Sequence, residues 1–159
     1  MDFRREYSYP DVKALVDECR LAGILSEAEA EAISVKKIQM FTASPLYKRI
    51  MSSEQIFKEE AFTVAVKPLD VYGEEKYAGL DGDVILHGRA DCYFVENGEV
   101  VLIDYKTDRY NEDSEEEFHE RYDIQMELYS RALEKVTGMR VKECYIFSLE
   151  SGKAIPVEV

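Results

Sequence analysis

Apolar residues in the first part of the chain recur at the three- and four-residue spacing of amphipathic helices. Val12 and Val16 belong to such a stripe, and Pro10 suits the first turn of a helix. We therefore predict a helix over residues 10–22, ended by Gly23.

Serines mark three further helix starts. Ser26 followed by Glu29 is a capping box, which predicts a short helix through Ile33. Ser34 and the pair Ser44-Pro45 open two more, which we expect to pack against each other.

The hydrophobic period then changes from helical to alternating. Residues 62–67 alternate apolar and polar side chains and predict a strand, and residues 69–83 are polar and turn-rich. Two more strands are predicted over residues 84–95 and 100–106, joined by Asn97-Gly98, a strong signal for a β-hairpin.

The last part of the sequence predicts one long helix and two strands. The helix spans Glu115 to Val136, and the acidic run Asn111–Glu117 forms its solvated beginning. Strands follow over residues 141–149 and after the turn at Ser151-Gly152. This order predicts an α/β or α+β fold with a mixed central sheet flanked by helices.

A length of 159 residues suits one domain, in which we expect a helical part, 1–52, and a sheet core, 53–159, with a long helix over 115–136. The absence of a long apolar run predicts no membrane-spanning helix.

Candidate chemistry lies on the predicted hairpin. A two-residue turn pairs Glu96 with Glu99, and the same register brings Asp91 directly opposite Asp104. A three-residue loop would shift the register and turn one aspartate to the other face. Two carboxylates among apolar neighbours require a cation or a shared proton, and Mg²⁺ prefers such oxygen ligands.

Lys106 extends this candidate site. It follows Asp104 by two residues, so both side chains point to one face of the strand, and the register sets it opposite Arg89. A metal next to a lysine suits phosphodiester hydrolysis, because the metal activates water and the ammonium stabilises the transition state.

The long helix carries a stripe that we expect to face the sheet. Gln125 is the one amide in it and needs hydrogen-bond partners, such as the lysine or a metal-bound water. The stripe consists of Phe118, Tyr122, Gln125, Tyr129, Ala132 and Val136.

Composition narrows the function classes. The three cysteines, Cys19, Cys92 and Cys144, are far apart and suit reduced thiols, and with only His87 and His119 a zinc cluster is not expected. The net charge of −13 is unusual for a protein that captures DNA by itself, because phosphate neutralisation supplies most non-specific affinity.

Three segments together resemble a known nuclease signature. They are Gly88-Arg89-Ala90-Asp91, Ile103-Asp104-Tyr105-Lys106-Thr107-Asp108 and Gln125-Met126-Glu127-Leu128-Tyr129. They look like the Gly-x-x-Asp, Asp-Tyr-Lys-Thr and Gln-x-x-x-Tyr motifs of RecB-type nucleases in the PD-(D/E)xK superfamily. The sequence most resembles the C-terminal nuclease domain of AddA (RexA), the helicase-nuclease subunit of the bacterial AddAB (RexAB) double-strand break repair complex.

The resemblance implies a PD-(D/E)xK, restriction-endonuclease-like core and a role for each matching residue. Asp91 and Asp104 match metal-binding acids, the Tyr105 backbone carbonyl matches a further metal ligand, and Lys106 matches the catalytic lysine. Gln125 and Tyr129 match the motif on the helix beside the site. Glu59 matches a glutamate ahead of the first core strand and is a candidate further ligand.

The resemblance also implies a context. We expect a Mg²⁺-dependent DNA exonuclease domain, with Mn²⁺ as an alternative ion, that belongs to a longer cytoplasmic bacterial protein. ATP would be used by its helicase part, which would deliver single-stranded DNA, and an AddB/RexB-like subunit would be its partner. The family's metal-ligand histidine lies on an upstream helix, whereas no histidine precedes His87 here.

Two other classes stay open at this stage. The chain could be a non-catalytic nuclease fold that docks a partner or guides DNA, or an acidic protein-interaction domain. An apolar surface patch without an acidic cleft would favour the interaction domain.

Overall fold

The computed structural model describes residues 1–67 and 82–158. Four helices, α1 (Tyr9–Leu21), α2 (Glu27–Ala32), α3 (Val35–Thr42) and α4 (Pro45–Ser52), precede the sheet. The strands are β1 (Gln55–Val66), β2 (Val84–Glu96), β3 (Glu99–Lys106), β4 (Val141–Ser148) and β5 (Lys153–Val157). Between β3 and β4 lie the 3₁₀ turn η1 (Glu112–Ser114) and the long helix α7 (Glu115–Thr137).

The sheet has the order β1-β2-β3-β4-β5 and is mixed, because β3 and β4 run parallel while the other neighbours run antiparallel. The connection from β3 to β4 passes through α7, as a parallel pair requires. The predicted α/β fold with a mixed central sheet is confirmed.

The predicted helix starts are confirmed at their caps. The side chains of Ser26, Ser34 and Ser44 each accept a hydrogen bond from the backbone N–H three residues later. Ser26 and Glu29 form both halves of the capping box.

The hairpin is also confirmed. Asn97 and Gly98 have φ values of 58° and 75°, as both central residues of a type I′ turn require, and Glu96 pairs with Glu99. The first strand was predicted too short: β1 begins at Gln55 because its charged first half pairs with β2. Most of the predicted loop, residues 69–83, lies outside the described residues.

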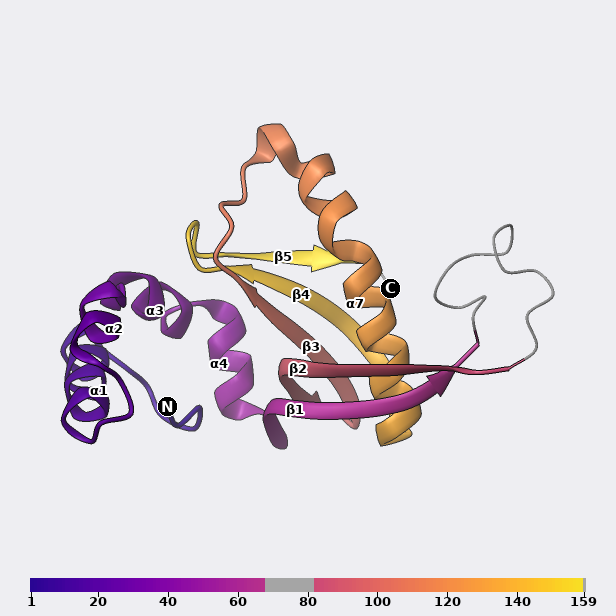
Figure 1. Cartoon of the computed structure of the whole chain (residues 1–159), viewed down its shortest axis with the longest axis horizontal. Helices are drawn as coiled ribbons and strands as arrows, with labels where there is room; N and C mark the ends of the chain where they lie inside the picture. The colour runs from indigo at the N-terminus through magenta and orange to yellow at the C-terminus, as the bar shows by residue number, and fades with distance from the viewer. Residues whose placement is uncertain (68–81, 159) are drawn as a thin grey trace.

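Two hydrophobic cores cover the two faces of the sheet. On one face α7 packs Met126 and Leu133 against strand residues such as Leu102. On the other, α3 and α4 pack Phe41 and Tyr47 against the sheet. Figure 1 shows α7 crossing the sheet and α1–α3 gathered beyond α4 at one end. The site residues on β3 therefore lie between helical layers.

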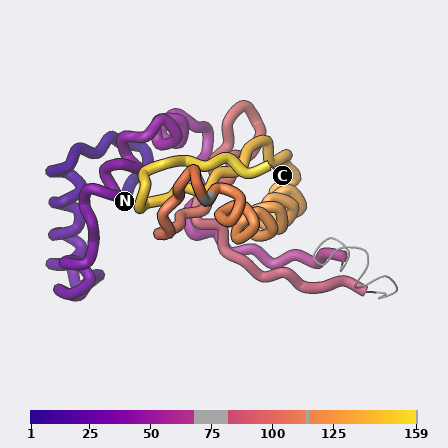
Figure 2. Tube along the Cα trace, turned by 90° about the horizontal axis from the view of Figure 1, so that it is seen from above, coloured from indigo at the N-terminus to yellow at the C-terminus, as the bar shows by residue number. Residues whose placement is uncertain are grey.

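The far half of the β1–β2 pair extends past the other strands as a two-stranded ribbon (Figure 2). Val136, which we predicted to face the sheet, is instead 54% exposed near the end of α7. Among the described residues, no helix combines the length and apolar character that crossing a bilayer requires.

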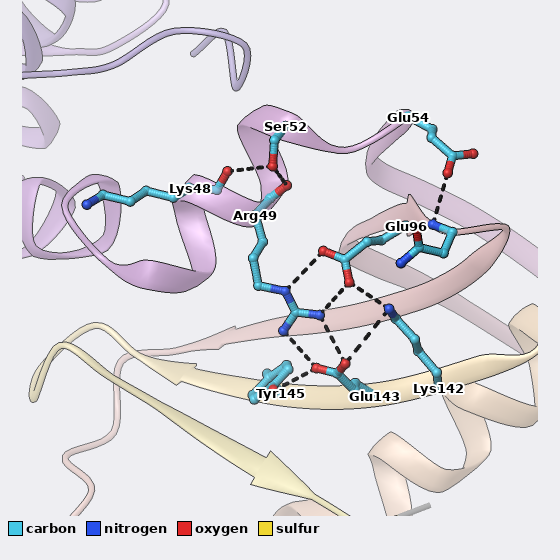
Figure 3. Close-up of polar contacts among 9 residues, drawn as sticks. Lys48, Arg49, Ser52, Glu54, Glu96, Lys142, Glu143 and Tyr145 are labelled. Atoms are coloured by element: carbon cyan, nitrogen blue, oxygen red, sulfur yellow. Dashed lines mark hydrogen bonds and ion pairs between the residues drawn. The ribbon is translucent and has the colours of Figure 1, made fainter.

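An ion network joins α4 to the sheet on the side of the N-terminal helices (Figure 3). Arg49 donates to both Glu96 and Glu143, with N–O distances from 2.7 to 3.2 Å. Lys142 Nζ donates to Glu96 at 2.6 Å, and Tyr145 Oη donates to Glu143 at 2.7 Å. The two glutamates are thus compensated by two cations and anchor α4 over β2 and β4.

This network predicts how stability depends on acidity. Arg49 and then Lys142 lower the pKa of Glu96 from 4.5 to about 2, so the folded state favours the charged carboxylate. The stabilisation is present above pH 4.5 and is lost as the pH falls towards 2. Because Glu96 is still 27% exposed and solvent screens it, we expect Glu96→Gln to cost about 1–2 kcal/mol at pH 7.

Urea unfolding between pH 2 and pH 7 measures this effect. The Glu96→Gln variant should lose less stability on acidification than the unmodified chain. Glu127→Gln removes an exposed pair with Arg131 and serves as the control, with little change expected. If the free energy of unfolding fell equally with pH in Glu96→Gln and in the unmodified chain, Glu96 would not be the source of the acid sensitivity.

Candidate metal-dependent active site

The candidate site lies where β2 separates from β3. The ladder between them follows the predicted register as far as the pair Cys92–Ile103 and ends there. Asp91 and Asp104 are the next residues beyond this last pair, and they do not form a ladder pair themselves. The predicted pair of Arg89 with Lys106 is not formed either, because it lies beyond the end of this ladder; on its other side Arg89 pairs with Ala61 of β1.

A local irregularity of β1 lies next to this separation. Glu59 is the residue of β1 opposite Asp91, and this pair is missing from an otherwise continuous ladder. Glu59 has φ of 52°, a left-handed conformation that non-glycine residues rarely adopt. Phe57 and Phe62 both face the core under α7, although they are five residues apart. In a regular strand, residues an odd number apart point to opposite faces, so β1 exchanges its faces between them.

Asp104 is the buried acid of the site. Its side chain is 4% exposed, and burial raises the pKa of its carboxyl while Lys106 opposes that shift. Asp91 raises the same pKa through charge repulsion.

Lys106 and Gln125 surround the Asp104 carboxylate. Gln125 Nε2 donates to Asp104 Oδ1 at 3.1 Å, and Lys106 Nζ donates to Gln125 Oε1 at 3.2 Å. Lys106 Nζ also lies 2.6 Å from Asp104 Oδ2 as an ion pair, although the geometry there is not that of a hydrogen bond. Gln125 thus ties α7 to both members of the pair, and the predicted need of this amide for partners is met.

The Tyr105 backbone contacts the other acid of the site, Asp91. Its N–H donates to Asp91 Oδ2 at 2.9 Å. Leu149 N donates to Lys106 O at 2.8 Å, so the Lys106 carbonyl points to the β4 side, and the alternation of the backbone turns the Tyr105 carbonyl to the β2 side. The Tyr105 ring packs on the other side of the sheet, with its centroid 5.1 Å from that of Phe41.

Tyr129 and Glu59 lie farther from the acids. Tyr129 makes no hydrogen bond to Asp104 or Lys106; its ring packs edge-on against Phe62 with centroids 5.0 Å apart. Glu59 is 66% exposed and pairs with Arg89 at 3.6 Å.

Phe62 in turn covers Gly88, the glycine of the Gly-x-x-Asp motif. A β-carbon on Gly88 would lie 2.3 Å from Phe62 Cζ, so only glycine fits there without a shift. Tyr129, Phe62 and Gly88 therefore form a stack, defined by these three residues, that fixes β2 under α7 three residues before Asp91.

The histidines are not brought to the acids. His87 Nδ1 lies 2.9 Å from Thr63 Oγ1 on the β1–β2 ribbon, and His119 Nδ1 lies 2.9 Å from Asp123 on α7. Two side chains that we did not predict as part of the site adjoin Lys106 instead, namely Tyr122 and, through it, Asp108. The sequence offered one signal for each: Tyr122 belongs to the stripe of the long helix, and Asp108 directly follows the Asp-Tyr-Lys-Thr motif.

The arrangement fits a hard divalent cation. Asp104 Oδ2 is buried and accepts no hydrogen bond, and the Lys106 ammonium lies 2.6 Å from it. A metal ion on this oxygen would therefore replace the contact with Lys106. Within residues 1–67 and 82–158, no three His, Cys, Asp or Glu side chains gather as a complete metal cage. Mg²⁺ does not need one, because it is commonly held by one or two carboxylates with waters and substrate phosphate.

A mixed sheet between helices, with two acids and a lysine where neighbouring strands part, defines the class of metal-dependent nucleases with a restriction-endonuclease-like core. The model of the PD-(D/E)XK nuclease superfamily matches residues 8–157. The chain belongs to this superfamily, whose members generally use divalent metal ions.

Relatives place the chain more narrowly. It is 33% identical over 153 residues to an ATP-dependent helicase/nuclease subunit of Clostridium acetobutylicum, covering 96% of this chain and 12% of that protein. The same-named protein of Acetivibrio thermocellus is 34% identical, with 94% and 12% covered. That of Thermoanaerobacter sp. is 34% identical, with 98% and 13% covered. The chain is homologous to the nuclease domain of these proteins and spans about an eighth of their length.

Proposed function

We propose that this chain is a Mg²⁺-dependent deoxyribonuclease domain that hydrolyses phosphodiester bonds of single-stranded DNA as an exonuclease. The observation that carries the proposal is the buried Asp104 oxygen without a hydrogen bond, beside Asp91 and Lys106. Mn²⁺ is the alternative ion, because its ligand preferences overlap those of Mg²⁺.

We assign the residues of the site two roles, metal binding and stabilisation of the transition state. Asp91, Asp104 and the Tyr105 carbonyl would hold the metal, which when bound would polarise the phosphate and lower the pKa of a water. Lys106, held by Gln125, is the charge that stabilises the extra negative charge of the transition state. Glu59, at the position of β1 opposite Asp91, would serve at most as an outer ligand and would have to leave Arg89 to do so.

We further propose that the domain acts inside an ATP-dependent helicase/nuclease in double-strand break repair and recombination in the bacterial cytoplasm. The names of its relatives support the helicase/nuclease part of this context. ATP would serve a helicase motor elsewhere in the protein, and a second subunit of the AddB/RexB kind would be the partner.

The charge of the chain agrees with delivery of DNA by such a motor. A net charge of −13 repels a phosphate backbone, whereas a strand that is fed into the site has a high effective concentration without strong intrinsic affinity. Binding of a free strand by this chain should therefore be weak and salt-sensitive.

Cleavage of a 5′-labelled single strand with Mg²⁺, with Mn²⁺ and with EDTA tests the proposed activity. Product formation with either ion and none with EDTA is expected. Absence of cleavage with both ions would overturn the proposal and favour a non-catalytic module that docks a partner or guides DNA.

A further inference from the structure

The ammonium of Lys106 has a third neighbour besides Asp104 and Gln125. The centroid of the Tyr122 ring lies 5.1 Å from Lys106 Nζ, within the range of a cation–π interaction. Tyr122 lies on α7, nearly one turn before Gln125, so the helix supplies two of the three groups around the ammonium.

Tyr122 is itself held in place. Its hydroxyl donates to Asp108 Oδ2, and Arg121 Nη1 donates to the same oxygen at 3.2 Å. The ring of Phe118 packs against that of Tyr122 with centroids 5.0 Å apart. Asp108, which lies just after β3, is itself held by β4, because Ser148 Oγ donates a hydrogen bond to its backbone carbonyl at 2.7 Å. The ring face is therefore fixed from the strand as well as from the helix.

We infer that Tyr122 is a positioning residue for Lys106, and that Asp108 anchors the Tyr122 ring. The inference rests on the proposed function. Without metal, Asp104 is the nearest anion to the ammonium, at 2.6 Å. A divalent cation on Asp104 competes for that carboxylate and repels the ammonium. The Tyr122 ring and the Gln125 oxygen, by contrast, keep the ammonium beside the site, where the phosphate binds.

The chain offers a matched control in Tyr110. Its ring also packs edge-on against Phe118, with centroids 5.4 Å apart, and carries a cation, Lys153 Nζ, 5.5 Å from the centroid. Its hydroxyl likewise donates to a carboxylate, that of Glu115, at 2.7 Å. Tyr110→Leu therefore removes the same kinds of contact from the same neighbour without touching Lys106.

Kinetics of single-strand cleavage with Mg²⁺ test the inference. Tyr122→Leu should lower kcat roughly tenfold, equivalent to about 1.4 kcal/mol, with KM changed less than about twofold. Tyr122→Phe keeps the ring but loses the contact with Asp108, so kcat should fall by less than in Tyr122→Leu but measurably. Tyr110→Leu should leave kcat unchanged. Equal losses of kcat in Tyr110→Leu and Tyr122→Leu, in step with their melting temperatures, would reduce Tyr122 to helix packing and overturn the inference.

A second readout does not depend on nuclease activity. The ε-CH₂ resonances of Lys106 in ¹H–¹³C spectra should be shifted by the Tyr122 ring current, and the shift should persist on adding Mg²⁺ alone. Tyr122→Leu should abolish the shift and Tyr110→Leu should not. Loss of the shift in the unmodified chain when Mg²⁺ is added would overturn the inference, even where cleavage itself is observed. A persistent shift in a chain that does not cleave would instead count against the proposed function alone.

Discussion

Replacing Asp104 by asparagine is expected to abolish DNA cleavage and to raise the melting temperature of the metal-free chain. Cleavage should fall about a thousandfold or more, since loss of a metal ligand removes ~4 kcal/mol of transition-state stabilisation. The stability gain follows from burial, which raises the pKa of the Asp104 carboxyl, so the charged form opposes folding at neutral pH. An amide has no such cost, and its oxygen can still accept the hydrogen bond from Gln125.

Thermal unfolding with and without Mg²⁺ measures the stability part of this prediction. Mg²⁺ should raise the melting temperature of the unmodified chain, because it binds the folded state, and should have little effect on Asp104→Asn. Asp123→Asn, which changes a carboxylate on α7 that faces His119, is the control and should retain both cleavage and the Mg²⁺ response. An Asp104→Asn variant that is less stable without metal, or that still cleaves, would refute this account of Asp104.

Replacing Gly88 by alanine is expected to destabilise the chain and to reduce cleavage. The new β-carbon would meet Phe62 Cζ at 2.3 Å, and Phe62 cannot move freely because Tyr129 packs against it. Overpacking of this kind costs about 1–3 kcal/mol, which lowers the melting temperature of a chain of this length by roughly 2–12 °C. Cleavage should fall as well, since the strand that shifts carries Asp91 three residues later.

A double-mutant cycle isolates this contact. Gly88→Ala in a Phe62→Leu background should cost at least about 1 kcal/mol less than in the unmodified chain, because the smaller side chain leaves room for the methyl group. Additive effects would mean that Gly88 is needed for another reason.

Local rules accounted for much of the fold. The caps at Ser26 and Ser44 and the turn at Asn97-Gly98 depend on neighbours in the sequence, and all three were predicted correctly. The first half of β1 could not be predicted, because its charged residues carry no alternation and it becomes a strand by pairing with β2. Val136 was misplaced because the end of α7 lies where the core no longer covers it.

The candidate site was predictable in its residues but not in its geometry. The motifs named Asp91, Asp104, Lys106 and Gln125, and the structure gathers them. The hairpin register does not extend to the two acids, because the β2–β3 ladder ends at Cys92–Ile103. The neighbouring break between β1 and β2 at Glu59, with its left-handed conformation, likewise has no sequence signal. The contact between Tyr122 and Lys106 joins a helix to a strand and likewise depends on tertiary packing.

The most direct test of the central claim is single-turnover cleavage of a labelled single strand with Mg²⁺ by the unmodified chain and by Lys106→Ala. Lys153→Ala, which removes an exposed lysine paired with Glu112, is the control. The account predicts cleavage by the unmodified chain and by Lys153→Ala, and a loss of roughly a hundredfold or more in Lys106→Ala. Cleavage by Lys106→Ala at the unmodified rate would contradict it, because the reaction would then take place without the group around which the site is built.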